Sequence, residues 1–272
     1  MEAPIVEIFS SFQGEGIWIG RRQIFIRFSG CNLACNYCDT QKSQSEDFGT
    51  LMTVDEVLKE VKNLTTPDLH SISFTGGEPL LYVDFINKVI EKMKSSENIR
   101  PNIQFMLETN GTLPESLAKI DGIDCVSLDI KLPEHFDDKD EYGSIDNDAH
   151  DSIVKDEYGS ILQKEIKSLK FLIEHDKNVY CKMVVLPSSK TNTIKNVINK
   201  IFKEISQNIS QKNLRNRENN EDKLDILWVI QPSSPLTEWK NQNNKLFAFS
   251  EMIGQYMDVL IIPQTHKLLN IE

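Results

Sequence analysis

Three cysteines stand close together near the N-terminus, at positions 31, 35 and 38. Their C-x3-C-x2-C spacing allows three thiolates to converge on one metal centre, and thiolates favour iron–sulfur clusters or zinc. A structural zinc site takes four protein ligands, and no histidine or cysteine follows Cys38 at the distance usual in a zinc finger. The triplet favours an iron–sulfur cluster with one open iron, while a zinc module with a distant histidine stays open as the alternative. The histidines available to that alternative are His70, His135, His150, His175 and His266.

The other two cysteines, Cys125 and Cys181, lie alone in apolar runs and are expected to be small buried side chains. An odd total of five cysteines does not fit a secreted disulfide framework, and it indicates metal or redox chemistry in a reducing compartment. The N-terminus lacks a signal-peptide pattern, and no stretch reaches the ~20 apolar residues that span a bilayer. These features predict a cytoplasmic protein with no membrane partner.

The formal net charge is -11, and most of it is local. Ten acidic residues and two lysines lie between residues 134 and 160, so this segment carries -8 of the total. A nucleic-acid footprint requires clustered Lys and Arg. The sequence therefore predicts a nearly neutral catalytic body and no nucleic-acid partner.

Apolar, β-rich runs recur along the chain with helical patterns between them. The apolar runs cover residues 22–28, 71–76, 102–108, 125–131, 179–185, 226–232 and 258–263. The helical patterns cover residues 53–64, 83–96, 161–175, 192–206 and 240–257, and the first begins with the capping-box spacing of Thr53 and Glu56. Because strands that alternate with helices pair in parallel, this order predicts an α/β fold, an open or partial TIM-type barrel of about six mainly parallel strands.

Two polar segments interrupt this pattern. The heptapeptide KDEYGSI occurs at 139–145 and again at 155–161, within an acidic stretch over about 134–160 that we expect to be a solvated loop. The segment 206–223 is rich in Asn, Gln and charge, and we expect a surface excursion. The chain is therefore predicted to form a single domain over 1–272 with two polar insertions.

A second group of chemically useful residues follows the ends of the predicted strands. Gly76, Gly77 and Glu78 follow the second apolar run in the sequence SFTGGEP, and Thr109-Asn110-Gly111 follows the third. Ligands of parallel sheets bind at the carboxyl ends of the strands, where the cysteines are also expected. Glycines there let the backbone approach a ligand closely.

Taken together, CNLACNYC (31–38) and SFTGGEP (73–79) resemble the two signatures of the radical S-adenosylmethionine (SAM) superfamily. Further matches resemble the 7-carboxy-7-deazaguanine synthase family within it. They are SFQGEG (11–16), Arg27 in FIRFSGC, Asp39-Thr40, LETNGT (107–112), DIK (129–131), QP (231–232) and PQTHK (263–267). This resemblance touches nearly the whole chain outside the two polar insertions.

The resemblance implies a radical SAM core with N- and C-terminal extensions. It implies a lyase that converts 6-carboxy-5,6,7,8-tetrahydropterin into 7-carboxy-7-deazaguanine and ammonia by radical ring contraction, on the route to queuosine-type and archaeosine-type nucleosides. The implied cofactors are a 4Fe-4S cluster, SAM and Mg2+. The implied partners are the pterin substrate, an electron donor such as flavodoxin or ferredoxin, and a second copy in a homodimer.

The resemblance also assigns individual residues. Cys31, Cys35 and Cys38 match the cluster ligands, and Thr40 matches a magnesium ligand, although it would otherwise cap the next segment. The residues that match or are expected to line the SAM site are Tyr37, Gly76, Gly77, Glu78, Glu108, Ser127, Asp129 and Lys131. The residues that match the substrate site are Gln13, Gly14, Glu15, Arg27, Thr75 and Pro232.

Some of these assignments have alternatives. Many relatives have Ser-Pro-Lys where this chain has Asp129-Ile130-Lys131, so Ser127 is a nearby substitute for the Asp129 contact. If Arg27 does not bind the substrate, it is expected to form a structural ion pair at a strand edge. If Pro232 does not contact the substrate, it is expected to terminate its strand. A glycyl-radical-enzyme activase is the rival enzyme class.

Because a carbon radical must be shielded from other hydrogen donors, residues 10–20 are expected to act as a lid.

Overall fold

A curved sheet of nine strands forms the centre of the structure, a computed structural model that describes residues 1–96, 102–136, 147–207 and 223–271. The strand order is β3-β1-β2-β4-β5-β6-β7-β8-β9. The strands are β1 (Glu2–Phe12), β2 (Arg22–Phe28), β3 (Thr50–Thr53), β4 (Ser71–Gly76), β5 (Gln104–Thr109), β6 (Cys125–Asp129), β7 (Val179–Val185), β8 (Leu224–Pro232) and β9 (Met257–Ile261). From β2 to β9 every pairing is parallel, whereas β1 pairs antiparallel with both β2 and β3.

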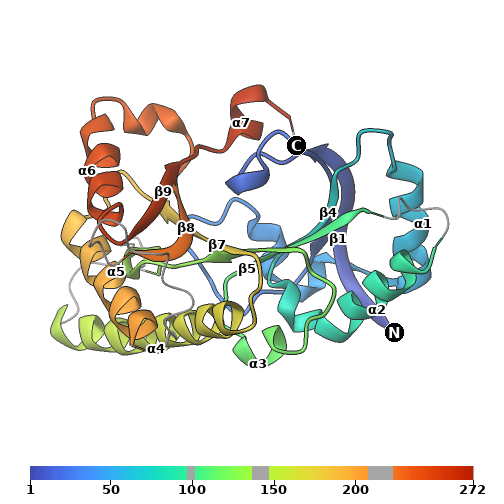
Figure 1. Cartoon of the computed structure of the whole chain (residues 1–272), viewed down its shortest axis with the longest axis horizontal. Helices are drawn as coiled ribbons and strands as arrows, with labels where there is room; N and C mark the ends of the chain where they lie inside the picture. The colour runs from blue at the N-terminus through green and yellow to red at the C-terminus, as the bar shows by residue number, and fades with distance from the viewer. Residues whose placement is uncertain (97–101, 137–146, 208–222, 272) are drawn as a thin grey trace.

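Figure 1 shows the sheet curving around a central space with the larger helices on its outer side, which is a partial barrel. The helices are α1 (Val54–Leu64), α2 (Val83–Lys94), α3 (Pro114–Leu117), α4 (Asn147–Glu174), α5 (Thr191–Ser206), α6 (Asn243–Ile253) and α7 (Thr265–Leu269). The predicted partial barrel is confirmed, and each of the seven apolar runs overlaps one of its parallel strands. The sequence analysis missed the antiparallel strands β1 and β3.

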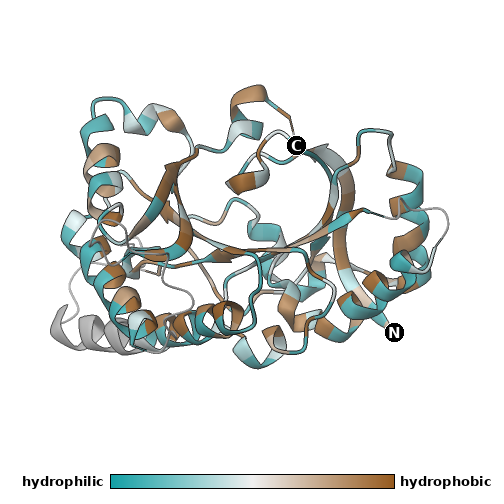
Figure 2. Cartoon of the chain, viewed as in Figure 1, coloured by the Kyte–Doolittle hydropathy of each residue, from teal (hydrophilic) through white to brown (hydrophobic). Residues whose placement is uncertain are grey.

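The outer helices form because their sequences are amphipathic and capped. Thr53 Oγ1 accepts a hydrogen bond from the Glu56 backbone N–H (N···O 3.3 Å), and Glu56 Oε2 accepts one from the Thr53 N–H (2.7 Å), so the predicted capping box starts α1. The same helix buries Val54, Val57 and Val61 against the sheet. Figure 2 shows this pattern throughout, with hydrophobic strands and helices whose outer faces are hydrophilic.

Helix α4 corrects the expectation for the acidic segment. We predicted a solvated loop over about 134–160, but the backbone is helical from Asn147 onward. Ile161 and Leu162 are buried, so the second KDEYGSI copy leads directly into the helix face that packs on the sheet. Residues 137–146, which include the first copy, and 208–222, most of the second insertion, lie outside the described residues.

The segment expected to be a lid, residues 10–20, packs into one end of the barrel. A short 3-10 helix, η1 (Gly16–Trp18), places Ile17 and Trp18 against Met106, Tyr180 and other inward residues of the strands. Gly16 has φ +64°, and a Cβ there would lie 1.9 Å from the Tyr180 hydroxyl. Figure 1 shows this N-terminal blue segment within the space that the sheet encloses. The open part of the barrel interior is therefore left at the carboxyl ends of the strands.

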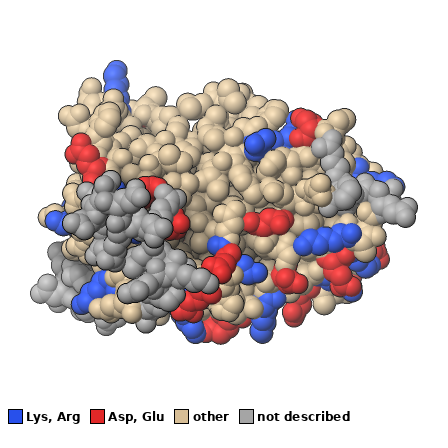
Figure 3. All heavy atoms as spheres, in the orientation of Figure 1, with Lys and Arg blue, Asp and Glu red and all other residues tan. Residues whose placement is uncertain are grey.

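The outer surface is polar. Figure 3 shows acidic and basic side chains intermixed along the lower margin of the face in view. Several form exposed ion pairs, such as Lys92 with Asp55 and Lys167 with Glu115 (N···O 2.5 and 2.6 Å), and such pairs contribute little stability. Within the described ranges, no helix combines the length and apolar character that crossing a membrane requires.

Candidate active site

A cavity of about 940 Å³ opens at the carboxyl ends of the parallel strands. Most of the predicted site residues line it. From the predicted cluster and metal set these are Cys31, Cys35, Cys38 and Thr40, and from the predicted SAM set Tyr37, Gly76, Gly77, Glu108, Asp129 and Lys131. From the predicted substrate set they are Gln13, Gly14, Glu15, Arg27 and Thr75. Three predicted residues, Glu78, Ser127 and Pro232, do not contribute to its wall.

The cysteine loop follows β2 directly and is held from both sides. The Cys31 backbone N–H donates to the Gln44 carbonyl (3.1 Å), and the Asn110 side-chain amide lies 3.9 Å from Cys31 Sγ. All three cysteines of the loop are free thiols. Three soft donors that face one cavity fit a metal centre there.

The donor set of the cysteine loop fits an iron–sulfur cluster. Cys31, Cys35 and Cys38 are free thiols that line one cavity, and thiolates are the ligands that iron–sulfur clusters take. The residues present therefore fit the implied cluster.

The glycine loop after β4 packs on the backbone that precedes the cysteines. Gly77 N–H donates to the Phe28 carbonyl (2.9 Å), and Glu78 N–H donates to the Gly30 carbonyl (2.8 Å). A Cβ on Gly77 would lie 1.9 Å from the Gly30 oxygen, and Gly76 has φ +112°. Side chains at these positions would push the two loops apart. The glycines are therefore required to hold the cysteine loop against β4.

Glu78 lies behind the cavity wall and joins two loops. Its fully buried carboxylate accepts hydrogen bonds from Leu80 N–H (3.0 Å), Asn110 N–H (2.8 Å) and Thr109 Oγ1 (2.7 Å). Burial raises the pKa of Glu78 to about 7, although these three donors favour the charged form. The geometry makes Glu78 a support for the loop after β5, and it shows no direct exposure to the cavity.

Alternating charges cross the floor of the cavity. Lys131 Nζ lies 2.9 Å from both Asp129 Oδ2 and the Tyr37 hydroxyl. Lys182 Nζ lies 3.3 Å from Asp129 Oδ1 and 2.7 Å from Glu15 Oε2. Burial raises the pKa of the Asp129 carboxyl, but the two ammonium groups outweigh it and hold that pKa below its usual range. The carboxylate is therefore charged at neutral pH.

Glu108 brings residues of the two predicted sites together. Its carboxylate accepts hydrogen bonds from Gln13 Nε2 (2.8 Å) and Thr75 Oγ1 (2.7 Å), which belong to the predicted substrate set. Gln13 is 3% exposed, and its side-chain oxygen accepts from the Glu15 backbone N–H (3.0 Å). Glu108 therefore orients the N-terminal segment that enters the barrel.

Arg27 faces the cavity from β2. Its Nε lies 2.8 Å from Glu7 Oε1, and its guanidinium carbon lies 5.4 Å from the centre of the Phe9 ring. Glu7 is the cross-strand neighbour of Arg27 on β1. The structural ion pair is thus present, and pairing through Nε leaves the terminal amino groups as donors.

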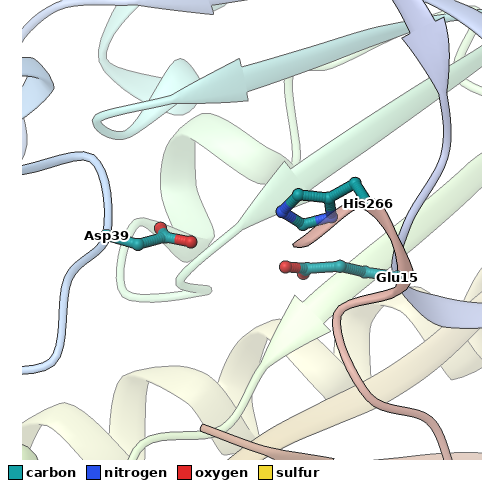
Figure 4. Close-up of side chains that lie close together, drawn as sticks. All are labelled: Glu15, Asp39 and His266. Carbon is teal, nitrogen blue, oxygen red and sulfur yellow. The ribbon is translucent and has the colours of Figure 1, made fainter. Parts of the chain in front are cut away.

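Segments from the two ends of the chain meet at the mouth of the cavity. Figure 4 shows Glu15, Asp39 and His266 converging there. Gln264 Nε2 donates to Glu15 Oε1 (2.8 Å) and to Asp39 Oδ2 (2.9 Å), and Lys267 Nζ lies 2.7 Å from Asp39 Oδ2. The carboxylates are already neutralised by lysines, so this group is a hydrogen-bonded junction between the N- and C-terminal segments.

Sequence reasoning missed several residues of the cavity. Lys182 has a detectable signal, because a lysine inside the apolar strand VYCKMVV is unusual unless its charge is paired. Gln231 and Ser233 line the wall on either side of the predicted Pro232. Gln264 and Lys267 lie inside the quoted PQTHK motif, but their contacts depend on tertiary structure alone.

The buried carboxyl group of Glu165 on α4 leads to a prediction about the pH dependence of stability. The side chain is fully buried, one oxygen accepts from the Lys131 backbone N–H (3.1 Å), and burial holds its pKa well above the usual 4.5. Above that pH only the unfolded chain ionises at Glu165, so this group makes folding less favourable as the pH rises. Glu165→Gln should therefore gain stability relative to wild type as the pH rises above the unfolded-state pKa, by at most about 1.4 kcal/mol per pH unit, until the folded carboxyl group itself ionises.

Urea denaturation of both proteins at several pH values between about 5 and 8 measures this difference. Two stability curves that run parallel with pH would show that Glu165 ionises in the folded protein.

Comparisons with known proteins identify a family model and full-length relatives that match this chain. The family model of the radical SAM superfamily matches residues 25–201. The 7-carboxy-7-deazaguanine synthase of Methanothermobacter thermautotrophicus is 39% identical over 272 residues, which is 100% of this chain and 98% of that protein. The protein of the same name from Methanocaldococcus jannaschii is 34% identical over 97% of this chain and 98% of its own length.

A solved structure supports the fold. The crystal structure of QueE from Escherichia coli aligns with a TM-score of 0.51 and covers 96% of this chain and 94% of that one, at 15% identity. At that identity the likeness concerns the fold alone.

Proposed function

This chain belongs to the 7-carboxy-7-deazaguanine synthase family of the radical SAM superfamily, and from that membership we propose the roles of its individual residues. The chain is a radical SAM enzyme that converts 6-carboxy-5,6,7,8-tetrahydropterin into 7-carboxy-7-deazaguanine and ammonia by ring contraction. One observation carries the assignment of the site: the cysteine triplet lines one cavity together with Gln13, Gly14, Glu15, Arg27 and Thr75, five of the six predicted substrate residues.

Cys31, Cys35 and Cys38 would hold the 4Fe-4S cluster, and SAM would bind beside it. Together these groups supply hydrogen abstraction from carbon, a chemistry that the side chains do not have. Around them the chain encloses the substrate, because η1 fills one end of the barrel and the junction of Glu15 with Gln264 narrows the other. Exclusion of water and of other hydrogen donors protects a carbon radical.

The substrate would bind between the N-terminal segment and β2. Gln13 and Glu15 offer amide and carboxylate groups to the donor and acceptor edge of the pterin, with Gly14 between them. Arg27 offers its terminal amino groups to the substrate carboxylate, which fixes the carbon next to it. Thr75 lies beside Glu108 on the same wall, and Pro232 would act from behind through its neighbours in the chain.

SAM would lie beside the cysteine loop. Tyr37 offers a ring face to a stacked base, and its hydroxyl is held by Lys131. Gly76 and Gly77 offer backbone groups close to the cluster, and Asp129 offers an acceptor. The supporting members of the set are Glu78, Glu108, Ser127 and Lys131.

Thr40 is proposed to bind Mg2+ together with the substrate. Its side chain makes no capping hydrogen bond to the following 3-10 helix, η2 (Gln41–Gln44), and it lines the cavity, so the cap interpretation loses support. Magnesium prefers oxygen ligands. Thr40→Val removes the hydroxyl with little change in volume and should raise the Mg2+ concentration for half-maximal turnover by about tenfold, roughly 1.4 kcal/mol.

Thr40→Ser keeps the hydroxyl and serves as the control, with an expected magnesium dependence close to that of the natural enzyme. Turnover measured across a magnesium titration decides the point, and a valine variant with an unaltered titration would remove Thr40 from the metal site.

Further features of the enzyme are proposed from family membership. The chain would act as a single catalytic domain over 1–272, in the cytoplasm and as a homodimer. A small redox protein such as flavodoxin or ferredoxin would deliver the electron. No nucleic acid or membrane is expected to take part.

The function is tested with purified protein reconstituted anaerobically with iron and sulfide. With SAM, Mg2+, a reductant and the carboxytetrahydropterin, it should release ammonia and 7-carboxy-7-deazaguanine in equal amounts, detected by chromatography and mass spectrometry. Cleavage of SAM that leaves the pterin unchanged would instead favour an activase that acts on a protein. Bound zinc without iron–sulfur absorbance would favour the zinc module.

A further inference from the structure

We propose that Lys182 is a positioning residue whose ammonium group bridges Glu15 and Asp129 and so fixes the substrate-binding segment against the cofactor end of the cavity. The inference rests on the proposed function, because the roles of Glu15 and Asp129 are assigned there. Lys182 itself is given no role by the family motifs on which those assignments rest.

Lys182 occupies a strand position at which a charged side chain is unusual. Along β7, Cys181 and Met183 face the main core under the helices, while Tyr180 and Lys182 face the barrel interior. The Lys182 side chain is only 9% exposed. Removing an ammonium group from water is costly unless it is paired with opposite charge. An apolar residue would fill this strand position at no such cost.

The ion pairs of Lys182 connect two residues, Glu15 and Asp129, that are far apart in the sequence. Asp129 is its cross-strand neighbour on β6, with Nζ to Oδ1 at 3.3 Å, whereas Glu15 is 167 positions away in the sequence and lies at 2.7 Å. Burial and the charge of Asp39 raise the pKa of Glu15, but Lys182 and the hydrogen bond from Gln264 together outweigh them, and the net pKa is lowered. Without Lys182, two largely buried carboxylates would face each other across the cavity floor.

The other contacts of the two carboxylates do not replace the bridge. Asp129 keeps Lys131 as a cation at 2.9 Å, but among the contacts described for Glu15 the remaining side-chain donor is the neutral amide of Gln264. The loss of Lys182 therefore falls mainly on Glu15. Because Glu15 lies directly before η1, its release also loosens the segment that fills the barrel.

The first measurement requires neither cluster nor substrate. Lys182→Met removes the charge and keeps the side-chain length, and it should increase amide hydrogen exchange over residues 13–18 in the protein without cofactors. Lys170→Met is the matched control, because Lys170 pairs with Glu204 (3.3 Å) on the outer helices, away from the cavity. In Lys170→Met, the rate of amide hydrogen exchange over residues 13–18 should equal that of the natural protein.

The second measurement separates positioning from general stability. The affinity of the same protein for the carboxytetrahydropterin, by anaerobic calorimetry, should fall about tenfold or more in Lys182→Met, the size expected for loss of one charge-assisted contact. In a Glu15→Gln background, Lys182→Met should lower the affinity for the pterin by less than about threefold, because its effect on binding passes through Glu15.

Three outcomes would overturn the bridge: natural exchange over 13–18 in Lys182→Met, unchanged affinity, or equal losses in both backgrounds. If Lys182→Met does not fold, Lys182→Arg and Lys182→Gln replace it, with protection of 13–18 kept in the arginine variant and lost in the glutamine variant. Equal protection in these two would equally overturn it. A natural protein that leaves the pterin unconverted would refute the proposed function, while the exchange experiment would still decide the bridge.

Discussion

Replacing Cys31, Cys35 or Cys38 with alanine is expected to abolish iron binding and product formation together. Each thiolate would ligate one iron, and two remaining cysteines hold a four-iron cluster poorly. Turnover should fall below detection, a loss of at least about a thousandfold relative to the natural enzyme, since no side chain substitutes for the cofactor. Iron and sulfide content after anaerobic reconstitution, together with product formation, measures both effects.

The control for these variants is Cys125→Ala. Cys125 is fully buried against Met106 and Tyr180 on the inner side of the sheet, outside the cavity wall, so its loss should cost stability but leave the iron content intact. Product formation by any one variant of the triplet would disprove the assignment of all three as ligands.

Arg27→Lys is expected to lower kcat/KM by about 10- to 100-fold, or roughly 1.4 to 3 kcal/mol, although the charge is kept. An arginine can pair with Glu7 through Nε and still present its terminal amino groups to a carboxylate. A lysine has one nitrogen and must share it between the two. Steady-state kinetics with the carboxytetrahydropterin gives the change directly.

The partner of Arg27 supplies the control. Glu7→Gln keeps an acceptor for Nε and should change kcat/KM by less than about threefold. Losses of similar size in the two variants would mean that Arg27 acts through its ion pair with β1. In that case another donor must hold the substrate carboxylate.

The fold was predictable where hydrophobic periodicity is strong. Parallel strands such as β5 and β8 are largely buried on both faces and therefore contain continuous apolar runs. Strand β1 was missed because it lies near the edge of the sheet, contains Pro4 and mixes exposed with buried positions. The helical part of the acidic segment was missed because its composition is polar, whereas the buried positions among the described side chains of α4 begin at Ile161.

The site was predictable where chemistry is local in sequence. The cysteine triplet and Gly76-Gly77 are short motifs, and the carboxyl ends of parallel strands bring them to one edge. Glu78 is different, because only the structure shows its carboxylate turned away from the cavity toward the loop after β5. Burial decides this orientation, and no spacing in the sequence encodes it.

The roles of Lys182 and of residues 13–18 depend on tertiary contacts. A lysine in an apolar strand signals a paired charge but does not identify Glu15 as its partner. Residues 10–20 were expected to act as a lid, and the sequence does not show where they pack. A Cβ on Gly16 would collide with Tyr180 inside the barrel, so glycine here permits close packing.

The contact between Gln264 and Glu15, 249 positions apart, sets an order on assembly. Contacts of such long sequence separation carry a large loop-closure entropy and form late in folding. During synthesis from the N-terminus, the cysteine loop and its neighbouring strands are complete long before Gln264 and Lys267 exist. The chain therefore passes through a stage in which the three thiols are present and the junction of Glu15 with Gln264 has not yet formed.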